Sequence, residues 1–147
     1  MKIEKIVFLD IDGVLNSHNF YCARQSFPNK MFNSSDDRVK SFELREIDLV
    51  PLGLLYQLVI ETGSKIVITS TWRLGRNPLY FRLLFYRKGI GFPEHTIIGK
   101  TDTLHAHTRG HEIEKWISDN NFTGRYVILD DDSDFLNYQK IQKISKI

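Results

Sequence analysis

The sequence predicts an α/β fold with a mostly parallel β-sheet. Three short, mainly apolar runs, at 6–9, 65–69 and 125–129, have the length and composition of strands that are buried on both faces. Segments with helix-capping residues separate these runs along the chain. Strands that alternate with helices are typical of parallel sheets, in which each helix connects one strand to the next.

The first predicted strand ends at two acids, Asp10 and Asp12, and a long segment without sustained periodicity follows. This segment is rich in Asn, Ser, Asp, aromatic and basic residues. We predict that residues 16–46 form a small insertion within a single domain of residues 1–147. Loops of this length are uncommon in compact domains and are often functional.

Two capped helices follow the insertion, with the second apolar run between them. Asp48 is a predicted N-cap for a mostly buried helix over 49–62, and Gly63 suits the position after its last turn. Asn77 is the predicted cap of the next helix, which starts with a proline and runs to Lys88.

The last third of the chain repeats the pattern. Residues 96–98 are predicted to form a short strand, and a helix starting near Arg109 is predicted to run to about Asp119. The third apolar run then ends in three consecutive acids at 130–132. The tail after Asp134 has no clear pattern, and a helix is the structure that we expect there.

The composition is that of an ordinary globular chain. Its 147 residues can bury a sizeable core, and a formal charge of +2 neither indicates nor excludes a polyanionic partner. Cys22 is the only cysteine, so an internal disulfide is impossible. No segment approaches the ~20 apolar residues that span a bilayer, and the first residues do not resemble a secretory signal. We expect a cytoplasmic protein without membrane contact, and its oligomeric state stays open.

Polar residues follow each predicted strand: Asp10 and Asp12, then Thr69 and Ser70, then the acids at 130–132. Because parallel strands end at the same edge of a sheet, we expect these groups to meet there. Two carboxylates as close as Asp10 and Asp12 repel each other unless a cation or a shared proton offsets the charge. The spacing indicates a metal site, a nucleophile beside an acid, or both.

Together the strand ends suit phosphoryl transfer. The acids of the first and third strands offer hard oxygen ligands, which Mg²⁺ prefers. The second strand end offers hydroxyl and backbone N–H donors, and Arg73 and Arg109 offer fixed positive charge. An anionic group held among them would meet a cation, donors and a carboxylate nucleophile, as phosphoryl transfer requires.

At these residues the chain resembles the haloacid dehalogenase (HAD) superfamily of phosphohydrolases. The first motif of that superfamily, Asp-x-Asp-Gly, matches residues 10–13, and the second, a Ser or Thr that ends an apolar strand, matches Thr69. The fourth motif, paired acids with another acid a few residues on, matches 130–134. The third is a Lys or Arg near a helix start, for which Arg109 fits and Lys100 is a second candidate.

A narrower resemblance is to HAD domains associated with RNA repair. It is based on a Ser/Thr-x-Trp-Arg segment at 70–73, an Arg-Gly-x-Glu-Ile helix start at 109–113 and an Asp-Asp-Asp-Ser-Asp sequence at 130–134. The resemblance implies a Rossmann-like fold, with helices on both faces of the sheet and a small cap after the first strand. Many HAD folds add a strand after the fourth motif. Only thirteen residues follow Asp134 here, so we expect a trimmed or differently completed sheet edge.

The resemblance implies a Mg²⁺-dependent phosphatase with an aspartyl-phosphate intermediate. Asp10 would be the nucleophile, and Asp12 would protonate the leaving oxygen and then deprotonate water. The ion would be held by Asp10, the Asp12 backbone carbonyl and one of the paired acids, with Asp131 favoured over Asp130.

The remaining motif residues would contact the substrate. Thr69 and the amide that follows it, at Ser70, would bind a phosphoryl oxygen. Arg109 would stabilise the phosphoryl charge and orient Asp10, and Arg73 would add a substrate contact. Solvated or ion-paired arginines are the plainer alternative for both.

A small cap would leave the site open, which favours a large substrate. Aromatic and basic residues alternate through the insertion, which suits nucleic-acid contact as well as packing on the body. We therefore predict terminal phosphates of nucleic acid or nucleotides as substrates. A small-metabolite phosphatase resembling a nucleotidase and a non-catalytic phosphate- or nucleic-acid-binding module are the alternatives.

Two further features have plain interpretations. We expect Trp72 to pack against the body, with base stacking as the alternative. His105, His107 and His111 suggest zinc, but their spacing matches no closed structural site.

Overall fold

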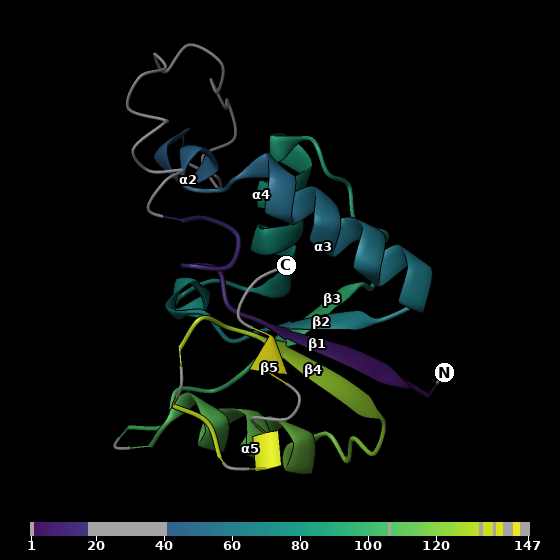
Figure 1. Ribbon diagram of the computed structural model, residues 1–147, viewed down its shortest axis with the longest axis vertical. Helices are drawn as coiled ribbons and strands as arrows, with labels where there is room; N and C mark the ends of the chain where they lie inside the picture. Colours follow the sequence, from purple (N-terminus) through teal and green to yellow (C-terminus); the bar gives the residue numbers. More distant parts are fainter. Residues whose placement is uncertain are drawn as a thin grey trace.

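The computed structural model describes residues 2–17, 41–105, 107–132, 134–136, 138–139 and 143–144. Its centre is a five-stranded, all-parallel sheet with the strand order β3-β2-β1-β4-β5 (Figure 1). The strands are β1 (Lys5–Leu9), β2 (Lys65–Ile68), β3 (Ile97–Lys100), β4 (Arg125–Leu129) and β5 (Lys143–Ile144). The first strand is therefore central, and the strands that carry the other two polar clusters lie on either side of it.

The register aligns the ends of the three inner strands. Leu9 pairs with Ile68 on one side and with Leu129 on the other. The next backbone bonds continue the alignment, because Asp10 N donates to Leu129 O at 2.9 Å and Thr69 N donates to Leu9 O at 2.9 Å. The residues that directly follow β1, β2 and β4 therefore lie side by side at the same edge of the sheet.

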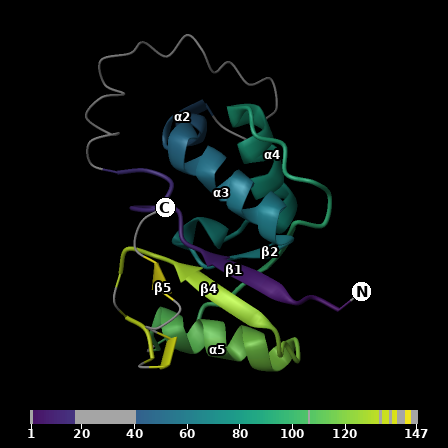
Figure 2. The ribbon, with the colours of Figure 1, turned by 45° about the vertical axis from the view of Figure 1, so that its right-hand side comes forward.

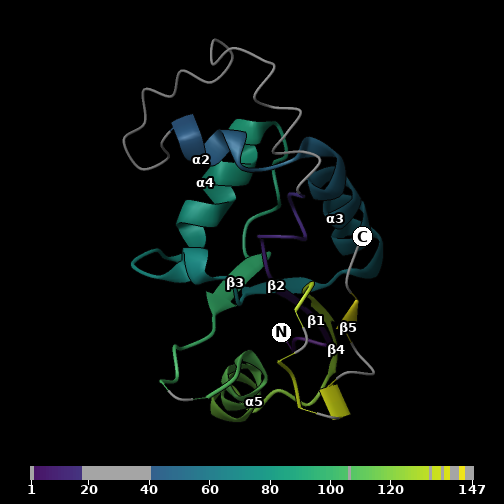
Figure 3. The ribbon, with the colours of Figure 1, turned by 60° about the vertical axis from the view of Figure 1, so that its left-hand side comes forward.

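Helices cover both faces of the sheet, as predicted (Figures 2 and 3). One face carries α2 (Ser41–Arg45), α3 (Leu49–Thr62) and α4 (Pro78–Lys88), and the other carries α5 (Arg109–Asp119). Successive side chains of a strand point to opposite faces, so Val7 and Leu9 pack under α3 and α4 while Ile6 and Phe8 pack against α5. These two cores confirm the α/β class and explain why β1 is apolar from Ile6 to Leu9.

The caps predicted for α3 and α4 are confirmed. Asp48 accepts a hydrogen bond from Val50 N at 3.0 Å, and Asn77 accepts one from Tyr80 N at 3.0 Å. Gly63, with φ of +68°, follows α3 in the left-handed conformation that glycine adopts at low cost. The boundaries of both helices agree with the prediction because local side-chain chemistry sets them.

The tail and the insertion differ from the prediction. The helix expected after Asp134 was wrong at Lys143–Ile144, where β5 pairs in parallel with β4 and adds a short edge strand, whereas residues 138–139 are in 3₁₀-helical conformation. The end of the insertion is also more regular than expected, because α2 lies within 16–46. Residues 18–40, with the aromatic and basic residues of the insertion, lie outside the described residues.

Across the portions of the chain that the structure describes, no helix is both long and apolar enough to cross a bilayer.

Candidate functional site

An acidic cluster lies at the carboxyl edge of the sheet. Asp10 follows β1, and Asp130 and Asp131 follow the adjacent strand β4. One carboxylate oxygen from each lies within 4.8 Å of the others. Asp10 and Asp130 are buried, whereas Asp131 is exposed. The parallel register therefore brings together acids that are far apart in the sequence, as predicted.

Arg109, the first residue of α5, reaches into this cluster. Its Nη1 atom lies 3.1 Å from Asp10 Oδ2 and donates a hydrogen bond of 2.7 Å to Asp130 Oδ2. Burial lowers the pKa of Arg109, but Asp10 and Asp130 outweigh burial, so the pKa is raised overall. The guanidinium therefore stays charged and partly neutralises the buried acids.

The pKa of Asp10 is raised despite the nearby Arg109. Burial raises the pKa of the Asp10 carboxyl to about 6, Arg109 opposes the rise, and Asp130 adds to it. Removal from water disfavours a carboxylate, and one arginine shared between two acids compensates only in part. A cation bound at the cluster would favour the ionised form of Asp10.

The structure directs Arg109, and not Lys100, toward Asp10. Lys100 Nζ instead donates to two carbonyl oxygens, Arg73 O at 3.1 Å and Arg76 O at 2.6 Å. These carbonyls belong to the loop after β2, so Lys100 ties that loop to β3. Of the two candidates for the third-motif cation, only Arg109 contacts the acidic cluster among the residues that the structure describes.

The start of α5 is fixed by close packing around Gly110. Gly110 N donates to Asp134 O at 3.2 Å, and Gly110 O accepts from Gln139 Nε2 at 2.9 Å. A Cβ atom on Gly110 would lie 2.8 Å from Leu136 N, so a larger residue would displace the helix start. Asp134 Oδ2 also accepts from Arg109 N at 3.2 Å. The fourth acid of the predicted motif thus caps the helix that carries Arg109.

The turn after Asp12 leaves room for Asp131. Gly13 has φ of +80°, and a Cβ atom built on it would lie 2.0 Å from Asp131 Oδ2. The Asp131 carboxylate therefore occupies the space that a side chain at position 13 would need. Glycine is required here both for the backbone conformation and for the approach of the acid.

Asp12 lies at the exposed side of the site, and two side chains donate to its two oxygens. Asn16 Nδ2 donates to Oδ1 at 3.2 Å, and Trp72 Nε1 donates to Oδ2 at 3.2 Å. Sequence reasoning missed both contacts, since Trp72 was assigned to packing and Asn16 to the start of the insertion. The position of Trp72 beside the second motif was the available signal, because that loop borders the same sheet edge.

Thr69 and Ser70 follow β2 and are fully buried. Within the described part of the chain, Thr69 Oγ1 has no hydrogen-bond partner. Buried hydroxyl groups are usually paired, so an unpaired one beside an acidic cluster is suited to receive a ligand oxygen. Ser70 Oγ accepts from Trp72 N at 3.2 Å and caps the 3₁₀ helix η2 (Thr71–Arg73).

Arg73 is buried within the protein. Its guanidinium donates five hydrogen bonds, to Thr101 O, Thr69 O, Ser70 O, Thr103 Oγ1 and Glu112 Oε2. Burial lowers its pKa, whereas Glu112, at 2.8 Å, opposes that change. All five N–H donors of an arginine are thereby engaged. The geometry favours a scaffold role, and the substrate contact predicted for Arg73 stays a prediction without support from these bonds.

The residues present fit a divalent cation. Three carboxylates that converge from two adjacent strands form the type of oxygen site that Mg²⁺ prefers. Arg109 offsets their mutual repulsion only in part, and a bound cation or a proton on Asp10 would reduce it further. Over the described residues, His105, His107 and His111 do not join any group of three ligand atoms, so nothing there supports a zinc site.

A comparison with known protein families gives a match over nearly the whole chain. The family described as "HAD domain in Swiss Army Knife RNA repair proteins" matches residues 6–144. Searches of curated proteins and of solved structures found no match. The matched range includes every residue that meets at the carboxyl edge of the sheet.

Proposed function

The chain belongs to the family of HAD domains in Swiss Army Knife RNA repair proteins, and we propose that it is a Mg²⁺-dependent phosphohydrolase acting through an aspartyl-phosphate. The placement of Asp10 carries the proposal. This buried carboxylate lies 3.1 Å from Arg109 Nη1, inside the acidic cluster, two residues before a second and exposed carboxylate. A nucleophile, a fixed positive charge and an acid/base are therefore adjacent.

In the proposed reaction, an oxygen of Asp10 attacks the phosphorus atom of a phosphate ester. A bond forms between that oxygen and phosphorus while the bond from phosphorus to the leaving oxygen breaks, and Asp12 gives its proton to the leaving oxygen. Asp12 then takes a proton from water as the water oxygen attacks phosphorus and the bond from phosphorus to the Asp10 oxygen breaks. Inorganic phosphate leaves, and both aspartates return to their starting states.

The metal ion would be held by Asp10, the backbone carbonyl of Asp12 and Asp131. Both oxygens of Asp130 already accept hydrogen bonds, Oδ2 from Arg109 Nη1 and Oδ1 from Asp132 N at 2.8 Å. This supports Asp131 over Asp130 as the ligand and gives Asp130 the role of orienting Arg109. When bound, Mg²⁺ would offset the negative charge that gathers on the phosphoryl oxygens.

The phosphoryl group would be bound by Thr69 and Arg109. The unpaired Oγ1 of Thr69 can donate to a phosphoryl oxygen, and the amide of Ser70 is the next donor along the chain. Arg109 supplies a charge that complements the phosphoryl oxygens. We propose terminal phosphates of nucleic acid or nucleotides as the substrate class, supported by the description of the family.

Hydrolysis of 4-nitrophenyl phosphate with Mg²⁺ and with excess chelator tests the reaction. We expect turnover only with the metal ion, and loss of turnover in Asp10→Asn and Asp12→Asn. Asp102→Asn is the matched control, because Asp102 is exposed and pairs with Lys115 on the surface. Full activity in Asp10→Asn protein or in chelator would rule out the mechanism.

A second assay addresses the substrate. It compares phosphate release from oligonucleotides phosphorylated at the 3′ or 5′ end, from mononucleotides and from small phosphate esters. We expect the highest kcat/KM for a terminal phosphate on nucleic acid or a nucleotide. A strong preference for small metabolites would favour the metabolite phosphatase, and tight oligonucleotide binding without turnover would favour a binding module.

A further inference from the structure

We propose that Trp72 is a positioning residue that holds the acid/base Asp12, an inference that rests on the proposed function. Trp72 Nε1 lies 3.2 Å from Asp12 Oδ2. An indole ring has a single N–H donor and no acceptor, so it can bind only an acceptor at that position. The bond joins the loop after β2 to the loop after β1, at the edge where the acidic cluster lies.

The indole is a rigid donor. Its ring is partly buried and packs on the core under α3 and α4. Its backbone is fixed at both ends, since Trp72 N donates to Ser70 Oγ at 3.2 Å and Trp72 O accepts from Arg76 Nη1 at 3.1 Å. Trp72 therefore has few ways to move when Asp12 changes its protonation state.

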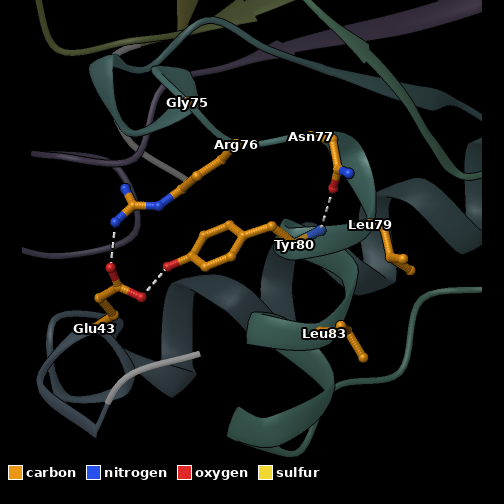
Figure 4. Close-up of a pocket in the computed structure, with 7 residues that line it drawn as sticks. All are labelled: Glu43, Gly75, Arg76, Asn77, Leu79, Tyr80 and Leu83. Carbon is orange, nitrogen blue, oxygen red and sulfur yellow. Dashed lines mark hydrogen bonds and ion pairs between the residues drawn. The ribbon is translucent and has the colours of Figure 1, made fainter. Parts of the chain in front are cut away.

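Arg76 is in turn anchored to α2. Figure 4 shows Arg76 and Tyr80 both pointing toward Glu43, which bonds to Arg76 Nη2 and to the Tyr80 hydroxyl. Glu43 is buried, and the Arg76 guanidinium lies over the Tyr80 ring at 4.7 Å from its centroid. Arg76 and Glu43 line this pocket and neutralise each other's charge. We therefore interpret the pocket as a structural support for the loop that carries Trp72, and not as a ligand site.

The other carboxylate oxygen of Asp12 accepts a hydrogen bond from a second side chain, Asn16. Asn16 donates to Oδ1 at 3.2 Å, donates to Glu46 O at 2.9 Å and accepts from Gly13 N at 2.8 Å. Asn16 is buried, so it can keep this orientation without competition from water. Asp12, which is itself exposed, thus has one rigid donor on each carboxylate oxygen.

This arrangement matters for proton transfer. An exposed carboxylate rotates readily, and a general acid must lie within hydrogen-bond reach of the leaving oxygen to act. Fixing the carboxylate before the substrate binds removes part of the entropic cost of reaching that geometry. The benefit should depend on the substrate, because a good leaving group departs without a proton and a poor one needs it.

The test compares Trp72→Phe with the wild type on two aryl phosphates of similar shape. We expect kcat/KM on phenyl phosphate, whose leaving group is poor, to fall about tenfold, a small part of the ~10²–10⁴-fold that general acid–base catalysis contributes. On 4-nitrophenyl phosphate the fall should stay within about twofold. kcat/KM is the informative constant, since it reports the steps up to the first irreversible one.

Trp116→Phe is the matched control, since the chain has two tryptophans and Trp116 packs against Phe8 on the other face of the sheet. Trp116→Phe should change kcat/KM by the same factor on both substrates. An equal loss on both substrates in Trp72→Phe would overturn the proposal, because it would mean that Trp72 only supports the fold.

A nitrogen-15 NMR measurement separates this inference from the proposed function. The wild type should show two indole N–H resonances, and Asp12→Ala should shift the Trp72 resonance while leaving that of Trp116 in place. An unshifted Trp72 resonance would overturn the contact whatever the activity. Absence of any phosphatase activity, with the shift observed, would instead reject the proposed function and leave Trp72 without a catalytic role.

Discussion

The carboxylate of Asp131 fills the space beside Gly13 that any other residue would use for its side chain. A Cβ atom on Gly13 would lie 2.0 Å from Asp131 Oδ2, and the φ of +80° at Gly13 already disfavours other residues. The turn that follows the first motif and the acid that follows β4 are therefore fitted to each other. This fit gives the first prediction.

Gly13→Ala should weaken Mg²⁺ binding. The methyl group pushes the Asp131 carboxylate away from Asp10, and the left-handed backbone adds roughly 1 kcal/mol of strain. We expect the Mg²⁺ concentration for half-maximal activity to rise about tenfold or more, a loss of about 1.4 kcal/mol in binding. Gly63→Ala is the control, because Gly63 has a similar φ of +68° and open space around it. An equal effect of both changes on Mg²⁺ binding would contradict the prediction.

In the metal-free protein, the ionisation of Asp10 should lower the free energy of unfolding increasingly as the pH rises from about 4 to about 6. Burial raises the pKa of Asp10 from 3.8 to about 6, so the unfolded chain loses this proton before the folded protein does. Above about pH 6, the folded protein holds a buried, ionised Asp10, and the loss of stability stays at its full size. Asp10→Asn should therefore raise the free energy of unfolding at pH 7.5 by about 2–3 kcal/mol and have little effect at pH 3.5.

Chemical denaturation in chelator at both pH values checks this prediction. Adding Mg²⁺ at pH 7.5 should raise the melting temperature of the wild type more than that of Asp10→Asn, because the ion stabilises the ionised carboxylate. A stability difference between the two proteins that does not change with pH would contradict it.

Arg109 and Lys100 should respond differently to substitution. Arg109→Gln removes the charge 3.1 Å from Asp10, and we expect kcat/KM to fall by about 10²-fold or more. Lys100→Gln removes only bonds to the carbonyls of Arg73 and Arg76, so activity should stay within about threefold. Steady-state kinetics on one phosphate ester measures kcat/KM for both variants. A larger loss in Lys100→Gln than in Arg109→Gln would identify Lys100 as the third-motif cation.

Substitution of Arg73 should lower the free energy of unfolding. Arg73→Met leaves the buried Glu112 carboxylate without its cation, which costs roughly 3–5 kcal/mol for a buried pair. The double change Arg73→Met with Glu112→Met should recover part of that loss, because no buried charge is then left alone. Urea denaturation measures both. An undiminished free energy of unfolding in Arg73→Met, together with a raised KM, would restore the predicted substrate contact.

The sequence predicted the sheet edge well because its signals are local. An apolar strand and the acids directly after it are adjacent in the chain, so Asp10 and Asp130 could each be assigned without knowing the fold. Parallel pairing then placed them side by side. The caps at Asp48 and Asn77 were predictable for the same reason, since a capping side chain bonds to a backbone amide two or three residues away.

The contacts that the sequence did not predict are long-range. Trp72 meets Asp12 across 60 residues, and Arg73 meets Glu112 across 39, so neither pair leaves a local pattern. Sequence reasoning placed Arg73 at the substrate because it follows the second motif, whereas three backbone carbonyls, the Thr103 hydroxyl and the Glu112 carboxylate accept its hydrogen bonds in the structure. The short strand β5 was missed because two residues carry no periodicity.

The central position of β1 also has a kinetic consequence. Leu9 and Leu129 pair in register although most of the chain separates them, and such non-local parallel pairing is a slow event in folding. Until β4 joins β1, Asp10 lacks both Asp130 and Asp131 as neighbours. The acidic cluster therefore forms only when β4 pairs with β1, and an ion that binds there would favour the completed fold over partly folded chains by mass action.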